Sequence, residues 1–201
     1  MDKKQKERLD KQLKFLIEID KLKTVKRMNL IADGTRREND AEHSWHFAMM
    51  ALIFYEYAYS PVVNLDRVIK MGLVHDLVEI YAGDTFCYDE EGAKDKAQRE
   101  TVAADRLFSL LPDDQAKEYR ALWEEFDLME TPDAIYAAAI DRFQPFLNNS
   151  VTDWHTWSLT DVTKSKVYKR MEIVKRGMPE LWCFVEELIT QAIKDGRLRE
   201  E

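Results

Sequence analysis

Few residues interrupt the helical patterns of this chain. Only six glycines and five prolines are spread over 201 residues, and the apolar side chains between them recur three and four positions apart. In residues 7–22 the apolar face consists of Leu9, Leu13, Leu16, Ile17 and Leu22. This spacing is typical of an amphipathic helix, whereas a half-buried strand alternates with a period of two. No alternating stretch of useful length and no repeat is visible, so the sequence predicts an all-α fold.

Capping residues and prolines divide the chain into further helices. Asp40 can cap a helix with Glu42 in its first turn, and Asn64 can cap the next. Thr131-Pro132 is another helix start, and Pro145 should kink or end the helix that follows. We expect one domain, residues 1–201, built as a bundle of about seven to eight helices. The helical patterns cover about 7–22, 41–58, 65–81, 93–111, 113–127, 132–148, 163–176 and 179–195.

Charge and composition exclude several classes of partner. The formal net charge of −8 argues against a nucleic-acid polymer or an anionic membrane as the main partner, although a few arginines can still hold a small phosphate. No apolar run approaches the roughly 18–20 residues that span a bilayer, and the charged N-terminus lacks a signal-peptide core. Cys87 and Cys183 are far apart and suggest reduced thiols. A cytoplasmic protein is the expectation.

The stretch GLVHDLVEIYAGD, residues 72–84, places ionisable groups in an apolar segment. On a helix, His75, Asp76 and Glu79 would share a broad face, and the residues around them are apolar on nearly every side. Such a helix is buried, and buried charges must be paired or bound to a metal ion. The alternative is a salt-bridged polar face with a hydrogen-bonded histidine. Asp84 follows on the loop after Gly83.

Two other segments offer ligands for a metal ion. His43 begins an apolar stripe that continues with Phe47, Met50 and Phe54, an unusual place for an imidazole; for His46 we prefer a structural role. Asp141 follows small residues on its own helix face, namely Ala134, Ala137 and Ala138. That aspartate needs a cation, which is either a metal ion or an arginine from elsewhere.

Together these segments supply two imidazoles and two carboxylates, from His43, His75, Asp76 and Asp141. This set suits one divalent ion such as Mn²⁺, Co²⁺ or Mg²⁺, with Fe²⁺, Zn²⁺ and Ni²⁺ as alternatives. A bound ion would activate water and polarise a phosphoryl group, which is the chemistry of phosphate-ester hydrolysis. Glu79 could orient the water or take its proton, and Asp84 could act as acid or base.

The residues quoted above resemble a known family. The order His43, His75-Asp76 and Asp141 resembles the HD-domain metal-dependent phosphohydrolases. The blocks RRENDAEHSWH, GLVHDLVEIYAGD and AIDRFQPFL are similar to the 5'-deoxynucleotidase subgroup, over roughly residues 10–190. The resemblance implies an all-α fold, one divalent metal at these four positions, proton transfer by Glu79 and Asp84, and a homodimer. The activity it implies is hydrolysis of deoxynucleoside 5'-monophosphates to nucleoside and phosphate.

One departure from the subgroup concerns substrate recognition. The nucleotidases have an arginine-tryptophan pair before the first histidine, and this chain has Arg27 followed by Met28. Arg27 is therefore a candidate phosphate ligand, while the selection of deoxyribose over ribose is left open. Arg36 and Arg37 are further phosphate-binding candidates, with solvated loop charges as the alternative.

The sequence leaves several other functions open. The metal centre could act on a cyclic nucleotide, a guanosine polyphosphate or a nucleoside triphosphate. A non-catalytic helical module that binds a metal or a nucleotide is the competitor from another class, although Glu79 and Asp84 argue for catalysis. Trp154 and Trp157 flank His155 and could stack on a base, close the core or form a dimer contact, so we leave them outside the predicted site.

Overall fold

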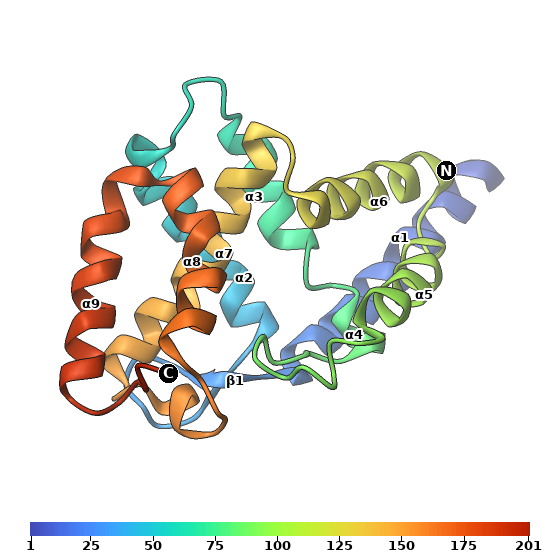
Figure 1. Cartoon of the computed structure of the whole chain (residues 1–201). Helices are drawn as coiled ribbons and strands as arrows, with labels where there is room; N and C mark the ends of the chain where they lie inside the picture. The colour runs from blue at the N-terminus through green and yellow to red at the C-terminus, as the bar shows by residue number, and fades with distance from the viewer.

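A computed structural model describes all 201 residues and confirms the all-α expectation (Figure 1). Nine α-helices are joined by short 3₁₀ segments, and α4 is a single four-residue turn. None of them combines the length and the apolar character of a membrane span. The helices are α1 (Lys3–Ile19), α2 (Asp40–Ile53), α3 (Leu65–Val74), α4 (Glu79–Ala82), α5 (Lys96–Phe108), α6 (Asp113–Leu128), α7 (Pro132–Val151), α8 (Lys164–Gly177) and α9 (Trp182–Lys194).

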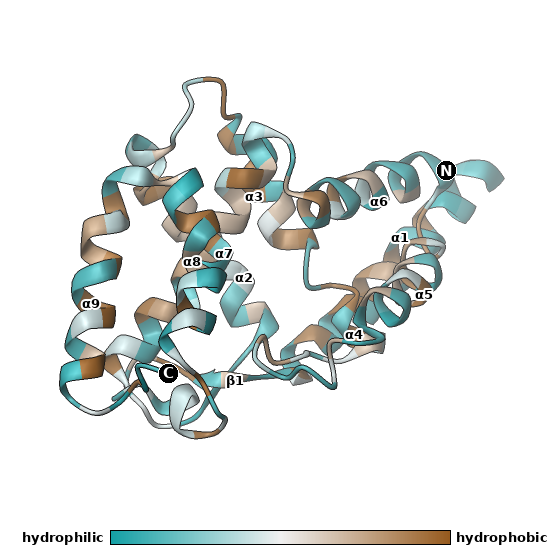
Figure 2. Ribbon diagram, viewed as in Figure 1, coloured by the Kyte–Doolittle hydropathy of each residue, from teal (hydrophilic) through white to brown (hydrophobic).

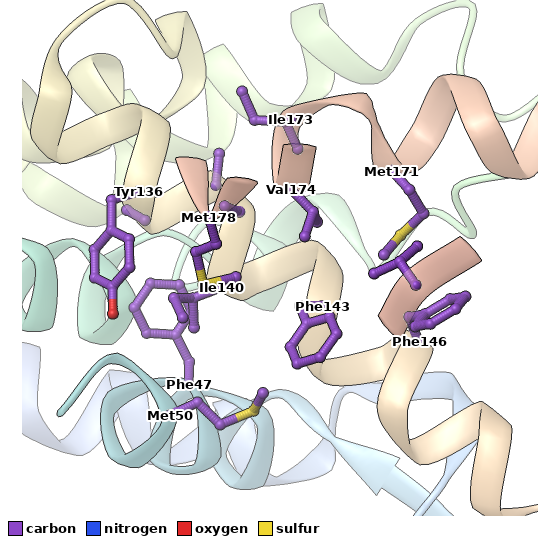
Figure 3. Close-up of a cluster of buried hydrophobic side chains, with 14 of the residues drawn as sticks. Phe47, Met50, Tyr136, Ile140, Phe143, Phe146, Met171, Ile173, Val174 and Met178 are labelled. Atoms are coloured by element: carbon purple, nitrogen blue, oxygen red, sulfur yellow. The ribbon is translucent and has the colours of Figure 1, made fainter. Parts of the chain in front are cut away.

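The buried apolar side chains form two clusters. The larger cluster joins α2, α3, α7, α8 and α9, which lie together on one side of the molecule (Figure 1). Figure 3 shows part of it, with Phe47 of α2 pointing towards α7. The smaller cluster joins the end of α1 to α5 and α6, and the helices around it have largely hydrophilic outer faces (Figure 2).

Helices α7 and α8 pack very closely because small residues meet between them. A Cβ atom on Gly177 of α8 would lie 2.6 Å from the Cβ atom of Ala139 and 2.9 Å from the carbonyl oxygen of Ile135. Real Cβ atoms do not approach so closely, so glycine is required at this crossing. The close packing brings the side chains of α8 next to those that follow Ala139 on α7.

The predicted helix over 65–81 is wrong in its second half. Helix α3 ends at Val74, residues 75–78 form consecutive turns, and α4 begins at Glu79. Val68 and Met71 belong to the larger cluster, whereas Leu77 belongs to the smaller one. Val74, the last residue of α3, already belongs to the smaller cluster, so the chain passes from one cluster to the other between Met71 and Val74. The turns that follow direct Leu77 and Val78 into the same smaller cluster. His75 and Asp76 lie in these turns.

A small antiparallel hairpin, β1 (Lys26–Leu30) with β2 (Arg37–Asn39), was not predicted. Its strands are short and polar, and their stability depends on mutual pairing, which no local pattern reveals. The cap of α2 was also wrong by one residue. Asn39 has extended backbone angles, and its side chain accepts a hydrogen bond from the Glu42 amide in a capping box, so Asp40 is the first helical residue.

Three helix ends were confirmed or corrected. Asn64 caps α3, and Thr131 caps α7 with Pro132 at the first position, as predicted. Pro145 was expected to kink or end its helix; it does not end α7, which continues to Val151. A proline can be accommodated inside a long helix when surrounding packing offsets the one missing hydrogen bond.

Candidate metal centre

Two histidines and one aspartate converge at the junction of the two clusters. The Nε2 atom of His43 on α2 lies 3.0 Å from Oδ1 of Asp141 on α7, and Nε2 of His75 lies 3.5 Å from the same oxygen. His43 is fully buried, and all three side chains offer one ligand atom within 4.8 Å of the others. Elements far apart in the sequence therefore place three atoms that can bind a metal ion around one point.

Hydrogen bonds on the far side of each ring fix the orientation of both imidazoles. The Nδ1 atom of His43 is 2.8 Å from Oε1 of Gln144, and Nδ1 of His75 is 2.9 Å from the carbonyl oxygen of Gly72. Because both partners are acceptors, each Nδ1 carries a hydrogen, and each Nε2 faces the centre, where its lone pair can take a proton or a metal ion. Nε2 of His75 is buried without a hydrogen-bond partner. A buried lone pair beside a carboxylate fits a bound cation.

Asp76 completes the group. Its Oδ1 atom lies 3.2 Å from Nε2 of His75, and its Oδ2 atom lies 3.8 Å from Nε2 of His43. Burial alone would lower the pKa of His75, but Asp76 and Asp141 raise it to about 10. Burial alone would raise the pKa of Asp141, yet its hydrogen bond with His43 and the positive charge of the two protonated histidines hold it well below its usual range. A divalent ion that bound between these carboxylates would have to displace these protons.

Three further carboxylates gather beside the ligand group. Asp40, Glu79 and Asp84 approach one another within 4.8 Å. Burial, followed by the charges of Asp76 and Asp40, raises the pKa of Glu79 well above its usual value. Burial and the charge of Asp76 raise the pKa of Asp40 to about 7, and burial raises the pKa of Asp84. Such a cluster holds and transfers protons near neutral pH.

Arg27 of β1 connects the two groups of carboxylates. Its Nη1 atom donates to Oδ2 of Asp76 at 2.7 Å and to Oδ1 of Asp40 at 3.2 Å. The side chain is only 12% exposed, and its buried Nε has no hydrogen-bond partner. The hairpin that was absent from the prediction is therefore what positions Arg27 against the site.

A cavity of about 300 Å³ opens from this group of residues. The predicted site residues on its wall are Arg27, His75, Asp76, Glu79, Asp84 and Asp141. His43 lies behind that wall, fully buried. Met28 also lines the cavity, as does Trp157, which stacks on Trp154 with ring centroids 4.2 Å apart; His155 does not line it.

The structure places Arg36 and Arg37 outside the cavity. Both side chains are exposed, and the guanidinium of Arg36 forms two hydrogen bonds with the carboxylate of Glu42. Arg37 donates to the backbone carbonyls of Arg27 and Lys26 across the hairpin. The two arginines therefore support the hairpin and the start of α2 from outside.

Four residues at the centre were not singled out as site residues from the sequence. Asp40 is predicted only as a helix cap. For Gln144, the sequence gives no indication of a role except its position three residues after Asp141. Arg142 and Arg170 both line the cavity. Arg142 adjoins Asp141 in sequence, whereas Arg170 is brought there only by the close packing of α7 and α8.

Comparisons with known proteins agree with this geometry. The family model for the HD domain matches residues 19–182, most of the chain. This chain belongs to the HD-domain family. A crystal structure from Magnetospirillum magnetotacticum MS-1, described as a predicted metal-dependent phosphohydrolase, is 49% identical to this HD-domain protein. It superposes with a TM-score of 0.90 and covers 96% of both chains.

The predicted resemblance to 5'-deoxynucleotidases is also confirmed. The human 5'-deoxynucleotidase HDDC2 is 30% identical over 139 residues, which are 69% of this chain and 66% of the human protein. The Schizosaccharomyces pombe 5'-deoxynucleotidase hdd1 is 27% identical over 135 residues, 65% of this chain and 66% of the yeast protein. The alignment thus spans just under two thirds of either relative.

Proposed function

We propose that this HD-domain protein is a metal-dependent phosphomonoesterase that hydrolyses deoxynucleoside 5'-monophosphates to nucleoside and phosphate. The observation that carries the proposal is the convergence of His43 Nε2, His75 Nε2 and Asp141 Oδ1, with Asp76 beside them, at the wall of a cavity. Proteins similar to this chain are named 5'-deoxynucleotidases, which supports the choice of substrate.

His43, His75, Asp76 and Asp141 would hold one divalent ion, with Mn²⁺, Co²⁺ and Mg²⁺ as the first candidates. When bound, the ion makes water nucleophilic near neutral pH and withdraws electron density from a phosphoryl group. Gln144 and the carbonyl of Gly72 keep both imidazole rings in the required orientation. Both core clusters contribute to the site, so we infer that residues 1–201 work as one unit.

The proton transfers fall to Glu79 and Asp84. A water oxygen forms a bond to phosphorus, and its proton passes to Glu79, whose raised pKa suits it to accept one. The bond between phosphorus and the 5'-oxygen breaks, and Asp84 gives that oxygen its proton. Arg27 keeps Asp76 and Asp40 in place and contributes positive charge to the phosphate from its side of the cavity.

The test is release of inorganic phosphate from a nucleotide panel with Mn²⁺, Co²⁺ or Mg²⁺. The panel pairs each deoxynucleoside 5'-monophosphate with its ribonucleotide, since Met28 lines the cavity, and adds 3'-monophosphates, cyclic nucleotides, a guanosine polyphosphate and nucleoside triphosphates. We expect the highest kcat/KM for the 5'-monophosphates with deoxyribose. A preference for another ester would change the substrate class, and no release from any of them would support a binding module.

We also propose that the protein is a cytoplasmic homodimer. Both cysteines are unpaired, which fits a reducing compartment. One face of α2 exposes large apolar side chains, including Trp45 at 66% and Ile53 at 61% exposure, and such faces mark contacts between proteins. Light scattering of the wild type and of Trp45→Glu checks the assembly. A wild type that is monomeric at micromolar concentration would refute it.

A further inference from the structure

Two arginines approach Asp141 from the side opposite the histidines. Oδ1 of Asp141 faces the imidazoles, whereas Oδ2 lies 3.7 Å from Nη1 of Arg142 and 4.0 Å from Nη2 of Arg170. Neither arginine forms a hydrogen bond with that carboxylate, although both lie beside it on the cavity wall. Their side chains are 15% and 31% exposed, so both are largely removed from solvent.

These two guanidinium groups are the cations of the cavity with the most unused hydrogen-bonding capacity. Arg142 donates only to the carbonyl oxygen of Ala138, at 3.2 Å, and Arg170 forms no hydrogen bond with the protein. In contrast, Arg27 binds Asp76 and Asp40, and Nζ of Lys96 lies 3.4 Å from Glu100. A guanidinium has five N–H donors, so the pair presents several free donors to the cavity.

Two neighbouring positive charges in a recess need an anion. Both guanidinium groups are largely buried and lie within 4.0 Å of the same carboxylate oxygen, so a single oxygen of Asp141 faces two positive charges. Asp141 can offset only part of this charge, because its other oxygen is engaged by the histidines. Planar guanidinium groups bind phosphate oxygens in pairs of parallel hydrogen bonds, which an ammonium group cannot do.

We propose that Arg142 and Arg170 bind the phosphate group of the substrate, holding its non-bridging oxygens beside Asp141. This inference rests on the proposed phosphomonoesterase function. It assigns the direct contact with phosphate mainly to α7 and α8, whereas most of the charge of Arg27 is offset by Asp76 and Asp40. The pair also explains how a dianion can enter a cavity lined by Glu79 and other carboxylates.

The test measures binding of inorganic phosphate by calorimetry to metal-free and Mn²⁺-loaded protein. We compare the wild type with Arg142→Gln, Arg170→Gln and the double variant. Loss of one charge-assisted hydrogen-bonding group should weaken binding about 10- to 100-fold. Arg176→Gln is the matched control, because Arg176 is an exposed arginine on the same helix and does not line the cavity. It should bind phosphate within about twofold of the wild type.

Several outcomes separate this inference from the proposed function. Arg170→Gln removes no hydrogen bond within the protein, so it should fold normally, and its KM should rise with bound Mn²⁺ unchanged. If phosphate binding depends on both arginines but the protein releases no phosphate from any nucleotide, the anion site is supported and the phosphomonoesterase function is rejected. Wild-type affinity in the double variant, or no phosphate binding to either form of the wild type, would overturn the inference.

Discussion

The replacement Gln144→Leu tests how the buried network behind the proposed metal centre orients His43. The Gln144 side chain is fully buried; its Oε1 accepts from Nδ1 of His43 at 2.8 Å, and its Nε2 donates to Oε1 of Glu38 at 2.8 Å. Leucine has a similar size but can neither accept nor donate a hydrogen bond. Glu38 retains a donor from Asn29 at 2.7 Å, whereas Nδ1 of His43 loses its only hydrogen-bond acceptor.

Two effects of known size follow from this loss. A buried donor without a partner costs about 1–3 kcal/mol of folding free energy. Removing the residue that orients a metal-binding histidine typically weakens metal affinity about 10- to 100-fold, or about 1.4–2.7 kcal/mol. We therefore expect Gln144→Leu to be moderately destabilised and to bind Mn²⁺ at least tenfold more weakly than the wild type.

Competition with a chelator of known affinity measures Mn²⁺ binding, and urea unfolding in the metal-free state measures stability. Gln115→Leu is the matched control, because Gln115 is a partly buried glutamine on α6 that accepts a hydrogen bond from Gln12. It should leave metal affinity unchanged. Equal Mn²⁺ affinity in Gln144→Leu and the wild type would refute the proposed role of the network.

Three other perturbations have defined outcomes. Asp40→Asn should move the acidic limb of the kcat/KM profile to lower pH. Glu79 must be ionised to accept a proton, and the charge of Asp40 raises the pKa of Glu79, so removing that charge lowers it. An acidic limb at the same pH would contradict this. Gly177→Ala should lower the free energy of unfolding by about 1–3 kcal/mol, since the new Cβ would lie 2.6 Å from that of Ala139, and an unchanged urea midpoint would disprove the tight crossing. Removing metal with EDTA should lower the melting temperature, and Mn²⁺ should restore it; a melting temperature insensitive to both would speak against a metal bound to the native state.

The sequence indicated the helices and the candidate metal ligands because both leave local signals. An imidazole at the start of an apolar stripe marked His43, and small residues on one face marked Asp141. Both positions are buried in the structure, and their side chains meet. The adjacent pair His75-Asp76 was also recognised, although the helix assumed for it ends at Val74.

Features that depend on contacts between residues far apart in the chain could not be predicted from the sequence. Arg36 and Arg37 precede His43 closely, but the hairpin turns them outward, and strand pairing of short polar segments has no periodic signature. Arg170 lies on a helix with many charged residues, which reads as a solvated face. The close packing of α8 on α7, as at Gly177 and Ala139, brings Arg170 within 4.0 Å of Asp141.

The most direct test determines bound metal and phosphate release on the same samples of wild type, Asp141→Asn and Glu79→Gln. The wild type should bind one divalent ion per chain and release phosphate from a deoxynucleoside 5'-monophosphate. Asp141→Asn should lose both metal and activity, whereas Glu79→Gln should keep its metal and lose activity by about 10²- to 10⁴-fold. Full metal content and full activity in Asp141→Asn would contradict the proposed centre.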